Sequence, residues 1–257
     1  MKPGFIAVFD SGVGGISVLA ELISHMPEED YVYFGDSKNA PYGERSVEEV
    51  RELTLKNIKM LVDAGAKAVV IACNTATSAA ISILREEYDI PVIGIEPAVK
   101  PAIMYKSNSV VLCMATAVTL HEEKFCELVS HFSGKARVIP LPCHELAGLI
   151  EKGEIHSEKT VNYLKNILSP FVGKVDSVVL GCTHYPFVKD EIAKIMGDGV
   201  KIFDGGLGTA KETKRRLVEA GIKKEQGICG NIEILNSLNT PDMVNLSKKL
   251  LESIKKC

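Results

Sequence analysis

Short apolar segments rich in Val and Ile alternate with longer segments of helical period along nearly the whole chain. Gly, Pro, Asp or Asn bound these apolar segments, which is typical of buried strands. The pattern predicts strands at 5–10, 31–36, 68–73, 91–95, 109–114, 136–141, 177–182 and 200–205. Alternating strands and helices indicate parallel sheets, whose ligand-binding residues follow the carboxyl ends of the strands. We therefore expect an α/β fold with sheets flanked by helices.

One helical segment is predicted in detail, between Ser46 and Gly65. Ser46 is a suitable N-cap, and Gly65 is suited to end the helix. One face of this segment is apolar, and its residues are Val47, Val50, Leu53, Leu55, Ile58, Leu61 and Val62. This spacing predicts an amphipathic helix packed on a sheet.

Composition excludes several classes of protein. The 257 residues are 46% hydrophobic, which is ample for a buried core. The formal net charge is -3, and Lys and Arg are scattered, so a nucleic-acid partner is not supported. No run of about 18 apolar residues is present to span a membrane, and the N-terminus lacks the pattern of a signal peptide. We expect a cytoplasmic protein with neither a nucleic-acid nor a membrane partner.

Two of the seven cysteines stand out by their context. An odd number of cysteines without a C-x-x-C pair argues against a disulfide framework and a zinc knuckle. Five are interpreted as small buried hydrophobes: Cys113, Cys126, Cys143, Cys229 and Cys257. Cys73 and Cys182 instead each follow a predicted buried strand and precede small polar residues. This context favours a chemical role.

The spacing of these two cysteines indicates an internal duplication. Cys73 and Cys182 lie 109 positions apart, and residues 5–15 have a rough counterpart a little over 100 positions later. We expect two similar α/β lobes, with one thiol on each side of a cleft that forms the active site. Proline interrupts the pattern at 96–101, so the predicted lobes are 1–97 plus 208–257, and 98–207. The tail after 208 is expected to be largely helical and to pack on the first lobe.

The glycine-rich segment after the first strand allows several interpretations. Gly12, Gly14 and Gly15 resemble a phosphate-binding loop, but Ser17 occupies the third position of G-x-G-x-x-G, so a dinucleotide site is the weaker interpretation. Alternatively, a tight turn exposes Asp10 and Ser11, and the N-terminus of the next helix binds a carboxylate. In a third interpretation, these two residues are only helix caps.

The residues around the two cysteines suit thiol chemistry. A thiolate is the reactive form, and a helix N-terminus or a protonated histidine favours it. His184, two residues after Cys182, could orient or protonate that thiol. Core packing explains one such cysteine, but two in matching contexts favour catalysis. Asp36 ends another predicted strand, and Pro41-Tyr42-Gly43 by itself is an ordinary turn signal.

Four motifs together resemble the glutamate racemases of the cofactor-independent aspartate/glutamate racemase superfamily. They are DSGVGG at 10–15, PYG at 41–43, ACNTA at 72–76 and GCTHYP at 181–186, and they cover nearly the whole chain in order. The resemblance implies that Cys73 and Cys182 are the catalytic bases, assisted by Asp10 and His184. Glu151 matches a cleft carboxylate more loosely. The implied substrate-binding residues are Asp10, Ser11, Pro41, Tyr42, Gly43, Asn74, Thr75, Thr183 and His184.

One segment departs from the pattern of the superfamily. Where the superfamily usually shows Gly-Thr-x-Ala-Thr, this chain has Ala115 in place of the Gly and Val118 in place of the Ala. Thr116 and Thr119 remain as candidate donors to a substrate carboxylate. The departure bears on the fit of the substrate.

The implied reaction explains the need for two thiols. Inverting a tetrahedral Cα requires removal of a proton from one face and delivery to the other, so two acid/base groups are needed. The resemblance implies that Cys182 deprotonates L-glutamate and Cys73 deprotonates D-glutamate. Neither a cofactor nor a metal is expected, because the sequence has no distinctive Schiff-base lysine motif and no His/carboxylate cluster.

The expected role and its alternatives follow from the resemblance. The substrate is expected to be L- or D-glutamate, with D-glutamate supplied to peptidoglycan synthesis. An aspartate or broad-specificity racemase is an alternative, as is a non-catalytic clamp for acidic ligands. A thiol redox protein has less support, because no resolving cysteine lies at short spacing. A homodimer is compatible with the sequence, which does not determine the oligomeric state.

Overall fold

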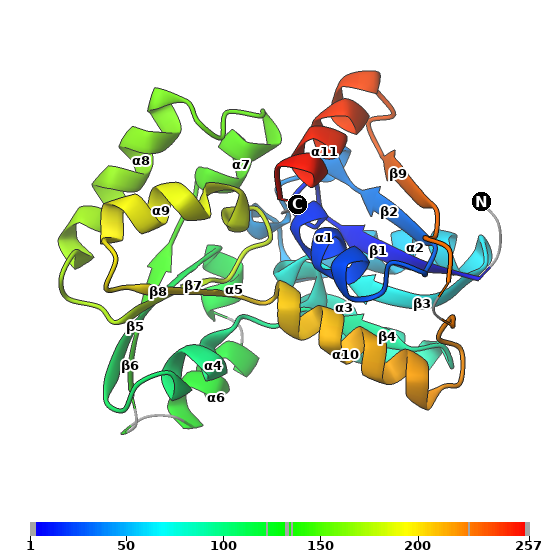
Figure 1. The fold of residues 1–257 in the computed structure, drawn as a ribbon, viewed down its shortest axis with the longest axis horizontal. Helices are drawn as coiled ribbons and strands as arrows, with labels where there is room; N and C mark the ends of the chain where they lie inside the picture. The colour runs from blue at the N-terminus through cyan, green and yellow to red at the C-terminus, as the bar shows by residue number, and fades with distance from the viewer. Residues whose placement is uncertain (1–3, 122, 132–133, 135, 226, 255–257) are drawn as a thin grey trace. The chain divides into compact units, whose positions relative to one another are not determined.

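The computed structural model describes residues 4–121, 123–131, 134, 136–225 and 227–254, so Cys257 lies outside the described residues. The chain divides into two compact units, Met1–Glu96 with Gly206–Cys257, and Pro97–Gly205. Each unit contains one parallel sheet flanked by helices (Figure 1). This confirms the predicted α/β fold class.

The first unit has a five-stranded sheet in the order β4-β3-β1-β2-β9, with every pair of neighbours parallel. Its strands are β1 (Phe5–Asp10), β2 (Tyr31–Gly35), β3 (Ala66–Ile71), β4 (Val92–Gly94) and β9 (Ile232–Asn236). All residues of β1 and β2 are buried, as expected for strands covered on both faces. Each strand predicted in this unit is present.

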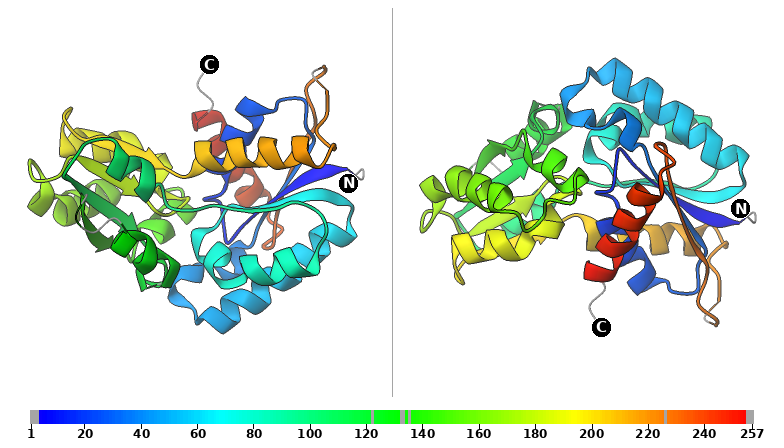
Figure 2. Two further views of the ribbon diagram at one scale, coloured as in Figure 1. Left: turned by 90° about the horizontal axis from the view of Figure 1, so that it is seen from below. Right: turned by 90° about the horizontal axis from the view of Figure 1, so that it is seen from above.

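Helices cover both faces of the first sheet (Figure 2). One face carries α1 (Ile16–His25), α10 (Gly206–Glu219) and α11 (Pro241–Ile254), and the other carries α2 (Val47–Asp63) and α3 (Asn74–Glu87). Two short 3-10 helices, η1 (Ser37–Asn39) and η2 (Tyr42–Glu44), follow β2. They connect the carboxyl end of β2 to α2.

Helix α2 forms where the sequence predicts it, because both of its ends are capped. The Ser46 hydroxyl accepts the Glu49 N–H at 3.3 Å, and the Glu49 carboxylate accepts the Ser46 N–H at 3.0 Å. Such a cap contributes about 1 kcal/mol. Gly65 adopts a φ of +98° just beyond the helix, which favours glycine.

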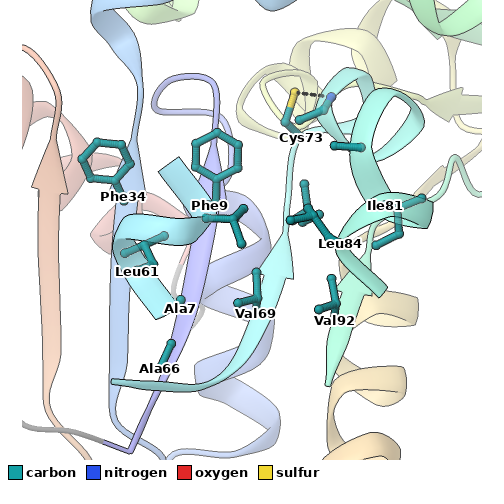
Figure 3. Packing of buried hydrophobic residues seen from close by; sticks show 14 of the residues in the cluster. Ala7, Phe9, Phe34, Leu61, Ala66, Val69, Cys73, Ile81, Leu84 and Val92 are labelled. Atoms are coloured by element: carbon teal, nitrogen blue, oxygen red, sulfur yellow. Dashed lines mark hydrogen bonds between the residues drawn. The ribbon is translucent and has the colours of Figure 1, made fainter. Parts of the chain in front are cut away.

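The core between this sheet and helices α2 and α3 reaches to the end of β3 (Figure 3). Phe9, Val69, Leu61 and Leu84 pack there, and Cys73 belongs to the same buried cluster. Fully burying each large apolar side chain contributes about 1.5–3 kcal/mol. This packing holds the strand end that carries Cys73.

The second unit has a four-stranded parallel sheet in the order β6-β5-β7-β8. Its strands are β5 (Ser109–Ala115), β6 (Ala136–Pro142), β7 (Ser177–Leu180) and β8 (Lys201–Asp204). Its helices are α4 (Val99–Met104), α5 (Ala117–His121), α6 (Glu123–His131), α7 (Leu146–Glu151), α8 (Glu158–Leu168) and α9 (Lys189–Met196), with 3-10 helices η3 (Ser169–Phe171) and η4 (Tyr185–Val188). Helix α4 contacts β5, β7 and β8, while α8 contacts α7 and α9.

The two sheets share one strand order. In each unit the first strand in sequence lies between the second and the third, and the fourth lies outside the third, as in β2-β1-β3-β4 and β6-β5-β7-β8. Strand β3 therefore corresponds to β7. The shared order supports the predicted duplication, and it makes the residues that follow β3 and β7 equivalent by topology.

Two expectations need correction. The tail contains a strand, β9, which pairs in parallel with β2 and was not predicted. It was missed because this edge strand is half exposed and lacks a continuous apolar run. Cys126 and Cys229 are exposed rather than buried, whereas Cys113 and Cys143 are buried as expected.

None of the helices in the described part of the chain combines the length and apolar character needed to cross a bilayer.

Candidate catalytic residues

In the first unit, three side chains lie at the carboxyl ends of neighbouring strands of the sheet. The Asp36 N–H donates to the Asp10 carbonyl at 2.9 Å, so the ends of β1 and β2 are paired. The Ala72 N–H donates to the Phe9 carbonyl at 2.7 Å, which pairs the ends of β1 and β3. Asp10, Asp36 and Cys73 are thus brought together by sheet register.

The glycine-rich turn after β1 packs tightly around Asp10. The Asp10 carboxylate accepts the Gly12 N–H at 2.9 Å, and the Tyr33 hydroxyl donates to the Gly12 carbonyl at 2.6 Å. A Cβ at Gly15 would lie 2.6 Å from the Cβ of Asp10, so only glycine fits there. Asp10 is fully buried and Ser11 is 6% exposed, so neither fits the interpretation in which the turn exposes them.

Cys73 is the N-cap residue of α3. Its Sγ accepts the Ala76 N–H at 3.4 Å, the bond drawn in Figure 3. The sulfur therefore lies at the positive end of a helix of 14 residues, where unpaired N–H groups stabilise negative charge. Asn74 and Thr75 form the first turn of the same helix and are buried. This position favours the thiolate form of Cys73.

The turn at 41–43 is held through Tyr42. Its hydroxyl donates to the Asp36 carboxylate at 2.7 Å, and burial together with this bond raises the pKa of Tyr42 well above its usual range. A phenol has a single proton to donate, and Tyr42 already donates it to Asp36. Pro41 is exposed and Gly43 is partly buried. Any donor that the turn offers a ligand must therefore come from its backbone.

In the second unit, Cys182, His184 and Glu151 form a chain of contacts. The Cys182 Sγ lies 3.5 Å from the His184 Nδ1, and the His184 Nε2 lies 2.6 Å from the Glu151 Oε1. Cys182 follows β7, His184 immediately precedes η4, and Glu151 ends α7. The structure brings Glu151, the loosest of the predicted catalytic residues, into direct contact with the predicted His184.

Charge is stabilised on His184. Burial alone lowers the pKa of this imidazole, but the hydrogen bonds with Cys182 and Glu151 outweigh burial and raise the pKa well above its ordinary value. Both contacts of the ring stabilise its protonated form, and its Nδ1 lies 3.5 Å from the Cys182 sulfur, in reach for proton exchange with it.

Three threonines of the second unit lie near strand ends. Thr116 follows β5, and its hydroxyl lies 3.0 Å from the Thr119 hydroxyl and accepts the Thr119 N–H at 3.3 Å. Thr183 is 4% exposed. A Cβ at Gly181 would lie 2.9 Å from the Cβ of Ala115, so glycine is needed at 181 beside the alanine that departs from the superfamily pattern.

Within the described residues, no group of three or more His, Cys, Asp or Glu side chains is placed to hold a metal ion. Sequence reasoning noticed Asp36 as a strand-end carboxylate but assigned it no role. It did not consider Asn57, whose amide donates to Asp36 at 3.1 Å from within α2. An aspartate at the end of a strand is a weak sequence signal for a functional residue, whereas an asparagine within a helix gives no such signal.

Comparisons with known proteins show the family to which the chain belongs. Residues 12–213 match the Asp/Glu/Hydantoin racemase family. A glutamate racemase of Clostridium perfringens is 50% identical over 254 residues, which are 98% of each chain.

Two crystal structures are similar in fold as well as in sequence. Glutamate racemase isoform RacE1 from Bacillus anthracis aligns with a TM-score of 0.87 and 30% identity, covering 98% of this chain and 95% of that one. Escherichia coli glutamate racemase, in complex with L-glutamate and the activator UDP-MurNAc-ala, aligns with a TM-score of 0.85 and 30% identity, covering 98% and 96%. The chain belongs to the Asp/Glu/Hydantoin racemase family and is an amino-acid racemase of the glutamate racemase type, an isomerase.

Proposed function

We propose that this enzyme interconverts L- and D-glutamate by proton transfer between Cα and two cysteines. Cys182 removes the α-proton of L-glutamate, and Cys73 removes that of D-glutamate. The observation that carries the proposal is the equivalence of the two thiols, since each follows the topologically matching strand of its own unit. A binding clamp needs donors but has no need of two matched thiols.

Each turnover transfers one proton in and one proton out. In the L-to-D direction the Cys182 thiolate takes the Cα proton and becomes a thiol, and the Cys73 thiol protonates the opposite face of the carbanion and becomes a thiolate. Exchange of protons with solvent resets both groups. The two sulfurs are supported differently, because an α-helix N-terminus supports Cys73 and the His184–Glu151 pair supports Cys182.

The carbanion and the substrate carboxylates need preorganised donors. We assign this role to Ser11, Asn74, Thr75 and Thr183, to Thr116 and Thr119, and to the backbone of the Pro41–Gly43 turn. Asp10 is assigned to assist Cys73, and Glu151 to assist His184. The E. coli neighbour was crystallised with L-glutamate, which supports glutamate as the substrate here.

The cellular role follows from the product. D-Glutamate is a building block of peptidoglycan, so we place the enzyme in cell-wall synthesis in the cytoplasm, acting on a small-molecule substrate without a cofactor. A broader specificity that includes aspartate is separated from this assignment by assaying both amino acids.

The first test is direct. Protein dialysed against a chelator, with no added pyridoxal phosphate, is expected to convert L-glutamate to the racemic mixture, because two thiols suffice for proton exchange at Cα. The circular dichroism signal of L-glutamate should decay to zero. L-Aspartate serves as the comparison substrate. A signal that stays constant for hours at high enzyme concentration would contradict the proposal.

The second test separates two bases from one. In D2O, the D-glutamate formed from L-glutamate should carry deuterium at Cα, because the incoming hydrogen comes from a thiol that has exchanged with solvent. Early in the reaction the remaining L-glutamate should stay largely unlabelled. Chiral separation followed by mass spectrometry measures both. Product that retains its original hydrogen would indicate a single base that returns the same proton.

A further inference from the structure

A buried carboxylate, Asp36, gathers three side chains from three different elements. Asp36 follows β2 and is 2% exposed. The Asn39 amide of η1 donates to its two oxygens at 3.1 and 3.0 Å, the Tyr42 hydroxyl of η2 donates at 2.7 Å, and the Asn57 amide of α2 donates at 3.1 Å. We call these four residues the Asp36 hub.

The hub connects the turn at 41–43 to the edge of the sheet that carries the catalytic candidates. Through its backbone N–H, Asp36 is bonded to the carbonyl of Asp10, the residue assigned to assist Cys73. Its carboxylate holds Tyr42 at the centre of the turn. The three side chains that donate to this carboxylate are neutral. Their hydrogen bonds compensate the cost of removing the carboxylate from water.

Tyr42 is restrained from two sides. Its ring packs against Phe9 of β1, with centroids 6.3 Å apart, and its hydroxyl is bonded to Asp36. The contact with Phe9 restrains the ring, and the bond to Asp36 restrains its hydroxyl end. A bond from a phenol to a charged, buried acceptor is short, strong and directional. The position of the backbone at 41–43 therefore depends on Asp36.

We propose that Asp36 is a positioning residue, which holds the Pro41–Gly43 turn through Tyr42 in the place where its backbone binds the substrate. This inference rests on the proposed function, because it assigns a role to a residue next to the proposed substrate site. Asp36 does not exchange a proton with Cα. It acts on substrate affinity through another residue.

The test compares two variants that break the same bond from its two ends. Asp36→Asn is nearly isosteric but presents an amide N–H to at least one hub donor, and Tyr42→Phe removes only the hydroxyl. Each is expected to raise the KM for both glutamate enantiomers about tenfold while kcat changes less than about threefold, because the turn binds ground state and transition state alike. In the double variant the two effects should not multiply, since both remove one interaction.

Tyr31→Phe is the matched control. Tyr31 of β2 is, like Tyr42, a buried tyrosine, and its hydroxyl donates to the Leu22 and Met26 carbonyls at 3.0 and 2.9 Å, away from the turn. Thermal unfolding should register the loss of this hydroxyl, while KM should stay at the parent value. A general loss of stability therefore does not imitate the effect expected for the hub.

Several outcomes would overturn the inference. Asp36→Asn or Tyr42→Phe with parent KM values would do so, as would effects that multiply fully in the double variant. If Asp36→Asn does not fold, the KM of Tyr42→Phe compared with that of Tyr31→Phe still tests the inference. Calorimetric titration with racemic glutamate measures affinity independently of turnover. A parent protein that binds glutamate without racemising it contradicts the proposed function. If the hub variants then bind glutamate more weakly than this parent protein, the inference about Asp36 is still supported.

Discussion

Replacing either Cys73 or Cys182 by Ser is expected to reduce kcat/KM by about 10²- to 10⁴-fold, the range typical of removing a general acid or base. A hydroxyl is a far poorer base than a thiolate, and each sulfur acts as the base in one direction and as the acid in the other. L- and D-glutamate have equal free energies, so the equilibrium constant is one and kcat/KM must fall equally in both directions. The measurement is racemisation from each enantiomer.

The chain offers a matched control for this change. Cys229→Ser alters the same atom in an exposed thiol of the first unit, and it should leave kcat/KM unchanged. Far-UV circular dichroism checks that all three variants are folded. A folded Cys73→Ser or Cys182→Ser enzyme that turns over at nearly the parent rate would refute the assignment of that cysteine.

The second large effect is expected at His184. His184→Asn removes the positive charge beside Cys182 and leaves the Glu151 carboxylate without its imidazole partner, so we expect kcat/KM to fall about 100-fold. The raised pKa of His184 favours its protonated form, which the asparagine side chain cannot replace. His156→Asn is the control, since His156 is an exposed histidine of the same unit. Near-parent activity in His184→Asn would contradict the role of this residue.

The same charge has a consequence for stability. A histidine whose pKa is raised by folding stabilises the native state fully below its unfolded pKa of about 6.5, and this contribution is lost as pH rises through the folded pKa. The parent protein should therefore lose more unfolding free energy between pH 6 and pH 9 than His184→Asn does. Urea unfolding at both pH values measures this difference.

Much of the fold could be predicted because parallel strands buried on both faces leave a strong signal. Such strands, for example β1 and β7, form continuous apolar runs that polar or turn-forming residues end. The partly exposed edge strands β6 and β8 also contain apolar runs, so each of the eight predicted segments contains a strand. Strand β9 was missed because Glu233 interrupts its apolar residues and leaves no continuous apolar run. Local chemistry also predicted helix α2, since a cap needs only residues that are near in sequence.

For the site as well, local features could be predicted from the sequence, whereas contacts between distant residues could not. By itself, the sequence determined which residues follow the strands, and therefore that Cys73, Cys182, Asp10 and Asp36 lie at strand ends. Only tertiary structure decided that Glu151 meets His184 and that Asn57 meets Asp36, because these contacts join residues 33 and 21 positions apart. Strand periodicity is a local property that burial imposes on each segment, whereas a side-chain contact depends on how whole elements pack. No spacing in the sequence encodes that packing.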